Sequence, residues 1–160
     1  MASIVKSLIE YEGIADFLPQ FEETYAPIKE FNVQETLDIP AAKPDIEQII
    51  KVKSELIITS TKVIKTPVAI SLDEQKLTGW KVIVEGELKQ TVQYVALEPT
   101  QSVHAAHFDV PISVYIVLPP DFKEGMCVSV EGYIEDIYAE KICRRQIFKN
   151  TTILLVARII

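Results

Sequence analysis

The stretch Trp80-Lys-Val-Ile-Val-Glu-Gly-Glu-Leu-Lys-Gln-Thr-Val-Gln-Tyr94 sets the fold class, because apolar and polar residues alternate along most of its length. Trp80, Val82 and Val84 would share one face of a strand, and the alternation resumes after Gly86. One apolar and one polar face are typical of an antiparallel sheet with one side buried. The glycine inside the run predicts a bulge or a bend.

Similar patterns occur on both sides of this stretch. Residues 53–65 are rich in Ile, Thr and Val, and residues 112–118 alternate until two prolines end the run. Residues 128–134 repeat the V-x-V-E-G pattern of residues 82–86, and residues 151–160 are mostly apolar. Several short strands separated by turn signals predict an all-β protein, an antiparallel β-sandwich.

One short helical turn is predicted within this β pattern, at residues 45–50. Pro40 and Pro44 bracket a turn, since the residue before a proline is pushed out of the helical region. Asp45 then occupies a helix N-cap position, with Gln48 three residues later as in a capping box.

Residues 1–32 differ from the rest and predict an N-terminal arm or leading strand, followed by a β domain over residues 33–160. Helix and strand patterns fit the first ten residues equally well, so periodicity leaves the conformation of the arm open. The arm could extend to a neighbouring chain, or it could fold back as a strand of its own chain.

Composition excludes several classes of function. The 160 residues are enough for one domain, and the net charge of −7 disfavours binding to nucleic acid. Lys6 and Glu10 interrupt the apolar start, so no secretory signal is expected. Residues 153–160 are far shorter than the roughly 20 residues of a membrane span. We therefore expect a protein made in a cytoplasm, with no membrane span.

Cys127 and Cys143 are too few for a disulfide framework. Two buried thiols are the default expectation in a reducing cytosol. A disulfide within or between chains is expected only if the protein later resides in an oxidising layer.

No active site is expected. His104 and His107 would point to opposite faces of a strand, and no third metal ligand is close in sequence. A triad of Ser102, His104 and Asp109 can be written down, but no nucleophile motif accompanies it. Glycine is too scarce for a phosphate-binding loop, so no catalytic residue, metal or cofactor is predicted.

Aromatic residues leave one binding function open. They could form a strip that stacks on sugar rings, although aromatic residues on strands more often pack within the sheet. The candidates are Trp80, Tyr94, Tyr115, Tyr133 and Tyr138.

Five segments together give the chain a family resemblance. They are Asp38-Ile39-Pro40, Lys43-Pro-Asp-Ile-Glu-Gln-Ile49, Val82-Ile-Val-Glu-Gly86, Gln93-Tyr94-Val95 and Phe108-x-Val-Pro-Ile112. This combination resembles the SPOCS domain family of endospore-forming, mainly clostridial bacteria, whose members often take part in spore-coat morphogenesis and carry a LysM module. The resemblance covers residues 33–119 best and the later strands more loosely, with Arg144 or Arg145 before an apolar strand. A LysM module is not expected within these 160 residues.

The resemblance implies a non-enzymatic structural protein of the endospore coat, exosporium or a spore-surface fibre. Such a protein would be made in the mother cell without a signal peptide and deposited on the spore surface. We expect it to self-associate into an oligomer or polymer by β-strand addition, or to join other spore-envelope proteins. The alternative function is a small carbohydrate- or peptidoglycan-binding adaptor. The candidate assembly residues are Ile4, Val5, Leu8 and Ile9 in the arm, and Ile153, Leu155 and Val156 near the end.

Overall fold

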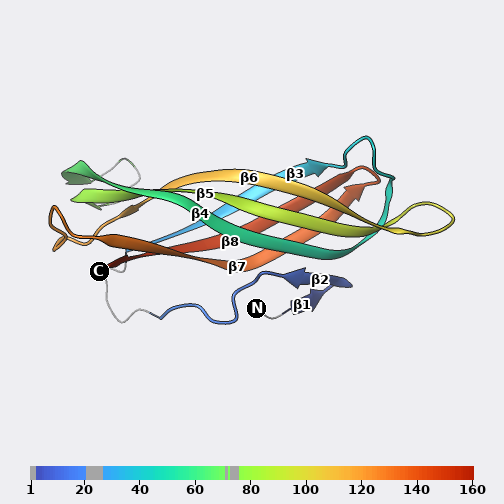
Figure 1. Ribbon diagram of the computed structural model, residues 1–160, viewed down its shortest axis with the longest axis horizontal. Helices are drawn as coiled ribbons and strands as arrows, with labels where there is room; N and C mark the ends of the chain where they lie inside the picture. The colour runs from blue at the N-terminus through green and yellow to red at the C-terminus, as the bar shows by residue number, and fades with distance from the viewer. Residues whose placement is uncertain (1–2, 21–26, 71, 73–75) are drawn as a thin grey trace.

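The structure is a computed structural model that describes residues 3–20, 27–70, 72 and 76–160 (Figure 1). The described residues form strands and loops and contain no helix. The strands are β1 (Ser3–Lys6), β2 (Ile9–Glu12), β3 (Ile28–Asp38), β4 (Ile46–Ile70), β5 (Lys76–Ala96), β6 (Val103–Val117), β7 (Val128–Cys143) and β8 (Gln146–Ile159).

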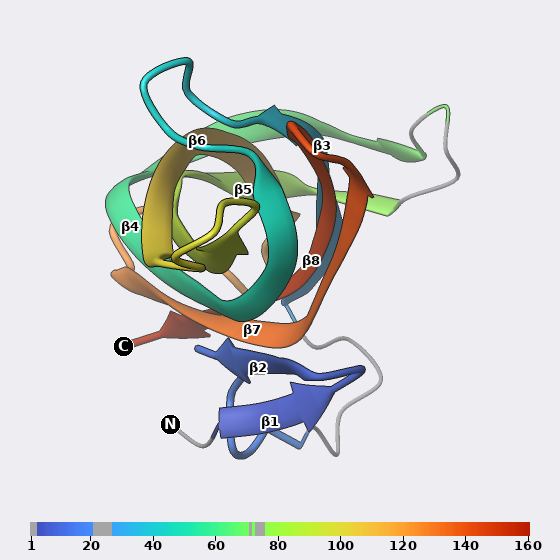
Figure 2. The same cartoon turned by 90° about the vertical axis from the view of Figure 1, so that its right-hand side faces the viewer.

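The strands make two sheets that pack face to face, so the predicted all-β antiparallel sandwich is confirmed. One sheet has the order β1-β2-β4-β5-β6 and the other has the order β3-β8-β7. Every pair of neighbouring strands is antiparallel except β2 and β4, which are parallel. An end-on view shows the strands of both sheets curving around a common interior (Figure 2).

The alternation in residues 80–94 correctly predicts which side chains of β5 face the core. Val82, Val84, Leu88 and Val92 point between the sheets and are fully buried. Gly86 is needed for close strand packing, because a Cβ at this position would lie 2.5 Å from the carbonyl oxygen of Ile57. The bulge predicted here lies on the neighbouring strand, where the register of β4 shifts between residues 58 and 60.

The predicted helical turn at residues 45–50 is wrong, because these residues begin strand β4. Two bulges shift the register, one between Ile46 and Gln48 and one between Ile49 and Lys51. Each bulge adds a residue, so residues 46, 49 and 52 all face the core at a spacing of three. That spacing imitates the period of a helix.

Arg145, in the turn between β7 and β8, holds the loop that carries the chain from one sheet to the other. Its Nη1 donates to the carbonyl of Lys43 at 2.6 Å and to the carboxylate of Asp45 at 3.1 Å. Its Nη2 donates to the carbonyls of Ile39 at 3.0 Å and Pro40 at 2.8 Å. A planar guanidinium can serve four acceptors at once, which fixes the path of residues 39–45.

Tyr94 supports the same loop from inside the sandwich. Its ring is fully buried, and its hydroxyl donates to the carbonyl of Pro44 at 2.7 Å. Burial of the phenol raises the pKa of Tyr94 above its ordinary value. The loop is therefore held on one side by Arg145 and on the other by Tyr94.

A buried polar cluster joins the two sheets. The ammonium of Lys149 on β8 is fully buried and donates to the side-chain oxygens of Gln90 on β5 and Thr151. Gln90 in turn donates to the carboxylate of Glu35 on β3 at 2.8 Å. Burial lowers the pKa of Lys149 to about 8, because desolvation disfavours the charged form.

We expect Arg145→Lys to lower the free energy of unfolding by about 2–3 kcal/mol, because a single ammonium cannot reproduce the four bonds of the guanidinium. Arg144→Lys is the matched control, since Arg144 is exposed and its change should stay within about 0.5 kcal/mol. Urea unfolding of the three proteins measures both effects. Equal stability of the two variants would contradict the structural role of Arg145.

The lowered pKa of Lys149 predicts that the free energy of unfolding rises at alkaline pH. Its pKa is about 8 in the folded protein against an ordinary value of 10.5, so between these values the unfolded chain binds more protons. The free energy of unfolding should rise by about 2 kcal/mol between pH 7.5 and 9.5 relative to the variant Lys149→Met. Urea unfolding of both proteins at the two pH values tests this. A difference that stays constant with pH would show that Lys149 does not titrate in this range.

Candidate functional site

The N-terminal residues fold back onto their own chain (Figure 2). β1 pairs with β2, and β2 pairs with β4 over residues 10–12 and 51–53. Of the candidate assembly residues, Ile9 is buried in this packing, whereas Ile4, Val5 and Leu8 are exposed. The described part of the predicted arm thus follows the fold-back alternative; residues 1–2 and 21–26 lie outside the described residues.

The N-terminal segment also covers the outer edge of β7. The hydroxyl of Tyr11 donates to the carbonyl of Ala139 at 3.3 Å and accepts from its N–H at 3.0 Å. Lys6 donates to the carbonyl of Ile137 at 3.1 Å, and the N–H of Ala15 donates to another β7 carbonyl at 2.9 Å. Because these groups are occupied, β7 does not present an open edge to another chain at residues 134–139.

Ile153, Leu155 and Val156, the other candidate assembly residues, are all buried. They lie on β8, which is the central strand of its sheet and pairs with β3 on one side and β7 on the other. A contact between chains through these side chains would require β3 or β7 to be displaced.

β3 is the edge strand on the opposite side of the same sheet. The N–H of Ile39 donates to the carbonyl of Arg145, and the N–H of Ala157 donates to the carbonyl of Pro27, both at 2.9 Å. Bonded positions alternate in an antiparallel pair, so odd-numbered residues of β3 bond to β8. The backbone N–H and C=O groups that point outward form what we call the β3 edge, and they belong to Glu30, Asn32, Gln34 and Thr36. No backbone bond within the described chain uses these outward groups.

β6, the long edge strand of the larger sheet, is interrupted by a proline. The N–H of Ala96 donates to the carbonyl of Ser102 at 2.8 Å, so even-numbered residues of β6 bond to β5. Pro111 therefore stands where an N–H would point outward, and it has none to offer. A proline at this position protects an edge strand against pairing.

The side of the sandwich between β3 and β6 leaves apolar surface only partly covered. Phe31 and Val33 on β3 and Phe108 and Val110 on β6 pack against the core, but each is only half-buried. Val52, under the N-terminal hairpin on the other side, is fully buried. The β3 edge therefore combines open backbone groups with apolar side chains that an added strand could cover.

The aromatic candidates do not form one strip. Tyr94 is buried between the sheets, and Trp80 and Tyr115 lie on neighbouring strands of the larger sheet. Tyr133 and Tyr138 project from β7 in the other sheet, each bonded to a nearby glutamate. The alternative of a sugar-binding adaptor therefore loses the aromatic platform on which it depended.

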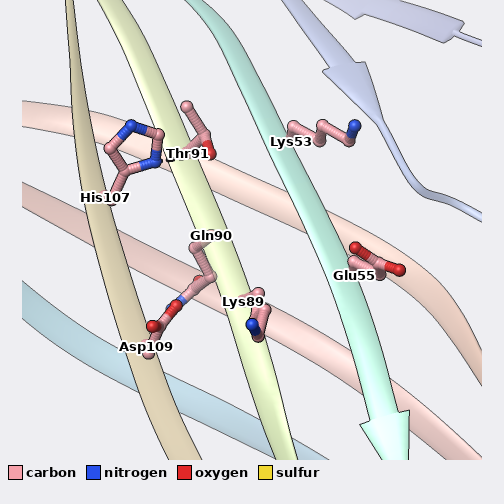
Figure 3. A pocket seen from close by; sticks show the side chains of 7 residues that line it. All are labelled: Lys53, Glu55, Lys89, Gln90, Thr91, His107 and Asp109. Atoms are coloured by element: carbon pink, nitrogen blue, oxygen red, sulfur yellow. Dashed lines mark hydrogen bonds between the residues drawn. The ribbon is translucent and has the colours of Figure 1, made fainter.

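A polar hollow of 310 Å³ lies on the outer face of β4, β5 and β6 (Figure 3). Its side chains form two rows across the strands, one headed by Lys53 and one by Glu55. The residues lining it are Lys53, Glu55, Lys89, Gln90, Thr91, His107 and Asp109. Beside it, Lys51 lies 2.9 Å from Glu12, and this hydrogen bond holds the pKa of the Glu12 carboxyl below its ordinary value. The hollow offers ammonium, carboxylate and hydroxyl groups for polar contacts.

The two histidines lie on opposite faces of β6, as expected. His107 contacts Thr91 in the hollow, with 3.1 Å between Nδ1 and Oγ1, and His104 stacks on Tyr94. The Nε2 of His104 lies 3.0 Å from the hydroxyl of Ser102. Asp109 pairs across strands with Lys89 in the other row, so Ser102, His104 and Asp109 do not meet as a triad.

Both cysteines are exposed, so the expectation of two buried thiols is wrong. Cys127 immediately precedes β7, and Cys143 is the last residue of that strand. A straight strand of 16 residues spans about 50 Å, whereas a disulfide needs Cα atoms less than about 7 Å apart. The two thiols of one chain therefore cannot bond to each other, and a disulfide between chains stays a prediction.

The β3 edge is the feature that the sequence analysis missed. The boundary predicted between residues 32 and 33 falls inside β3. The signal was present, because Phe31, Val33 and Leu37 alternate with polar residues at the strand period. Knowing that β3 is an edge, however, requires its pairing partner, which lies more than 100 residues away in sequence.

Comparison with known proteins supports the family resemblance. The model of the family described as SipL, SPOCS domain matches residues 45–142, which is more than half of the chain. No curated protein and no solved structure matches the chain. The described residues include no helix that could cross a membrane. The matched region contains β4, β5 and β6 complete, with nearly all of β7, and the chain therefore belongs to the SipL, SPOCS-domain family.

Proposed function

We propose that this sporulation-related protein is a non-enzymatic assembly module of the endospore envelope, and that it associates by β-strand addition. Family membership supports the sporulation setting. Deposition on the spore surface after synthesis in the mother cell, as part of the coat, the exosporium or a surface fibre, belongs to the proposal. Its partners are further copies of the chain or other spore-envelope proteins.

The observation that carries the proposal is the β3 edge. Three other described sheet edges are short or protected: β1 has only four residues, β7 is covered by Tyr11 and Lys6, and β6 contains Pro111. The outer edge of β4 pairs with β2 over residues 51–53 only, and its remaining described part is interrupted by Pro67. β3 is 11 residues long, pairs with β8 without a register shift and contains no proline. An open, regular edge strand is a template for a strand of another chain.

Strand addition at this edge would be favoured by backbone hydrogen bonds and by burial of apolar side chains. The outward backbone groups of β3 would exchange water for hydrogen bonds to the added strand. Alternate side chains of that strand would cover the half-buried Phe31 and Val33, and burial of apolar surface favours association. Both the backbone hydrogen bonds and the apolar contacts form by binding alone, which is consistent with a non-enzymatic role.

Gln34→Pro should reduce self-association, because it removes an outward N–H from the middle of the β3 edge and leaves the bonds to β8 intact. Sedimentation velocity over a range of concentrations, with reductant present, measures the effect. We expect concentration-dependent association of the unchanged protein and a monomer for the variant.

Asp109→Pro is the matched control, since it removes an outward N–H from β6, whose edge Pro111 already protects. This control should associate like the unchanged protein. Thermal unfolding of both variants shows that each one is folded. A monomer at all concentrations for the unchanged protein would refute the proposed self-association.

A further inference from the structure

The β3 edge is complementary to a second copy of itself. Two antiparallel β3 strands can bond only if the outward positions of one face the outward positions of the other, and these are the even-numbered residues. A twofold axis at Asn32 meets this condition. Asn32 then faces Asn32 of the partner subunit, and Glu30 faces Gln34 of the partner subunit.

The odd-numbered side chains, which face the interior of the sandwich, match in the same register. Lys29 would lie opposite Glu35 of the partner subunit, and the twofold axis repeats this pair of opposite charges. Phe31 would lie opposite Val33 of the partner subunit, so apolar side chains meet between the two charge pairs. Cross-strand pairs of these two kinds stabilise a sheet.

Neighbouring registers match less well. An axis at Phe31 would place the ammonium of Lys29 opposite the apolar Val33. An axis at Val33 would place Phe31 opposite the carboxylate of Glu35. An axis at Gln34 would place Glu30 opposite Asp38, and like charges directly opposite each other destabilise a sheet. Charge and apolar character together therefore select the axis at Asn32.

We propose that the β3 edge binds β3 of a second copy, antiparallel and centred on Asn32. This inference rests on the proposed function and specifies its partner. The product is a continuous six-stranded sheet, ordered β7-β8-β3-β3-β8-β7, with the same surface contributed by both subunits. The side chains of Asn32 and Gln34, bonded to Thr152 and Asn150 within each subunit, form one polar row across its outer face.

The charged side chains of this register are positioned to reach a partner. Lys29 is half-buried, with its ammonium 5.1 Å from the centre of the Tyr115 ring. Glu35 is also half-buried and accepts a hydrogen bond from Gln90 through one carboxylate oxygen, Oε1. A carboxylate has acceptor capacity beyond one hydrogen bond, so Glu35 can also receive Lys29 of the partner subunit.

Cysteine cross-linking tests the register in the full chain that also carries Cys127→Ser and Cys143→Ser. Asn32→Cys should form a disulfide-linked dimer with oxidised glutathione, because the two Cα atoms at the axis of an antiparallel pair lie about 5.5 Å apart. Glu30→Cys and Gln34→Cys should each stay monomeric on a denaturing gel, and an equal mixture of the two should cross-link. Thr36→Cys is the matched control and should not cross-link alone.

Lys29→Glu provides a second test that needs no cysteine. It places like charges opposite each other twice, so the dissociation constant of the dimer should rise by about tenfold or more. Lys43→Glu, on the loop after β3, makes the same change of charge outside the contact and should leave the constant unchanged.

The outcomes separate this inference from the function on which it rests. Association of the unchanged protein without cross-linking through Asn32→Cys would overturn the register and leave strand addition standing. Cross-linking by Thr36→Cys in place of Asn32→Cys would also overturn it. A monomeric unchanged protein would overturn the proposed function and this inference together.

Discussion

The hydrogen bonds of Arg145 are the contact on which the arrangement of the two sheets depends. β3 and β4 are consecutive strands, yet they belong to different sheets, so the loop between them must turn the chain across the sandwich. Arg145 fixes that loop from the tip of the smaller sheet, and Tyr94 fixes it from within the larger one. Lys43 and Asp45, which lie in the stretch 43–49 that carries the family resemblance, therefore form scaffold contacts with Arg145.

Alternation along the chain was enough to predict the sandwich and the buried face of β5, because side chains of a regular strand change face at every residue. It misassigned residues 45–50 because two bulges changed the phase of β4. The continuous apolar character of residues 151–160 also led to Ile153 and Leu155 as candidate interface residues, although a strand that is apolar on both faces is typical of the centre of a fold. Pairing between distant segments, such as β3 with β8, is not encoded in any local pattern.

The sheet edges of this protein are protected by different physical means. The Tyr11 hydroxyl occupies both backbone groups of one β7 residue, and Lys6 occupies a second carbonyl of that strand. Pro111 protects β6 because proline has no backbone N–H to offer to another strand. At this odd-numbered position the N–H would point away from β5, so its absence costs no hydrogen bond within the sheet. β3 has neither device, and its side of the sandwich is also where inward-facing apolar residues remain half-exposed.

Pairing of β3 with a second β3 uses the β3 edge of both molecules, so each molecule is monovalent with respect to pairing through this edge. Once two copies join through β3, neither has a free β3 edge, so pairing through this edge ends at a pair instead of continuing into a fibril. Association should then follow mass action without the lag phase of nucleated growth. Any larger layer must be built from such pairs through other surfaces, and Pro111 disfavours the long edge of β6 as one of them.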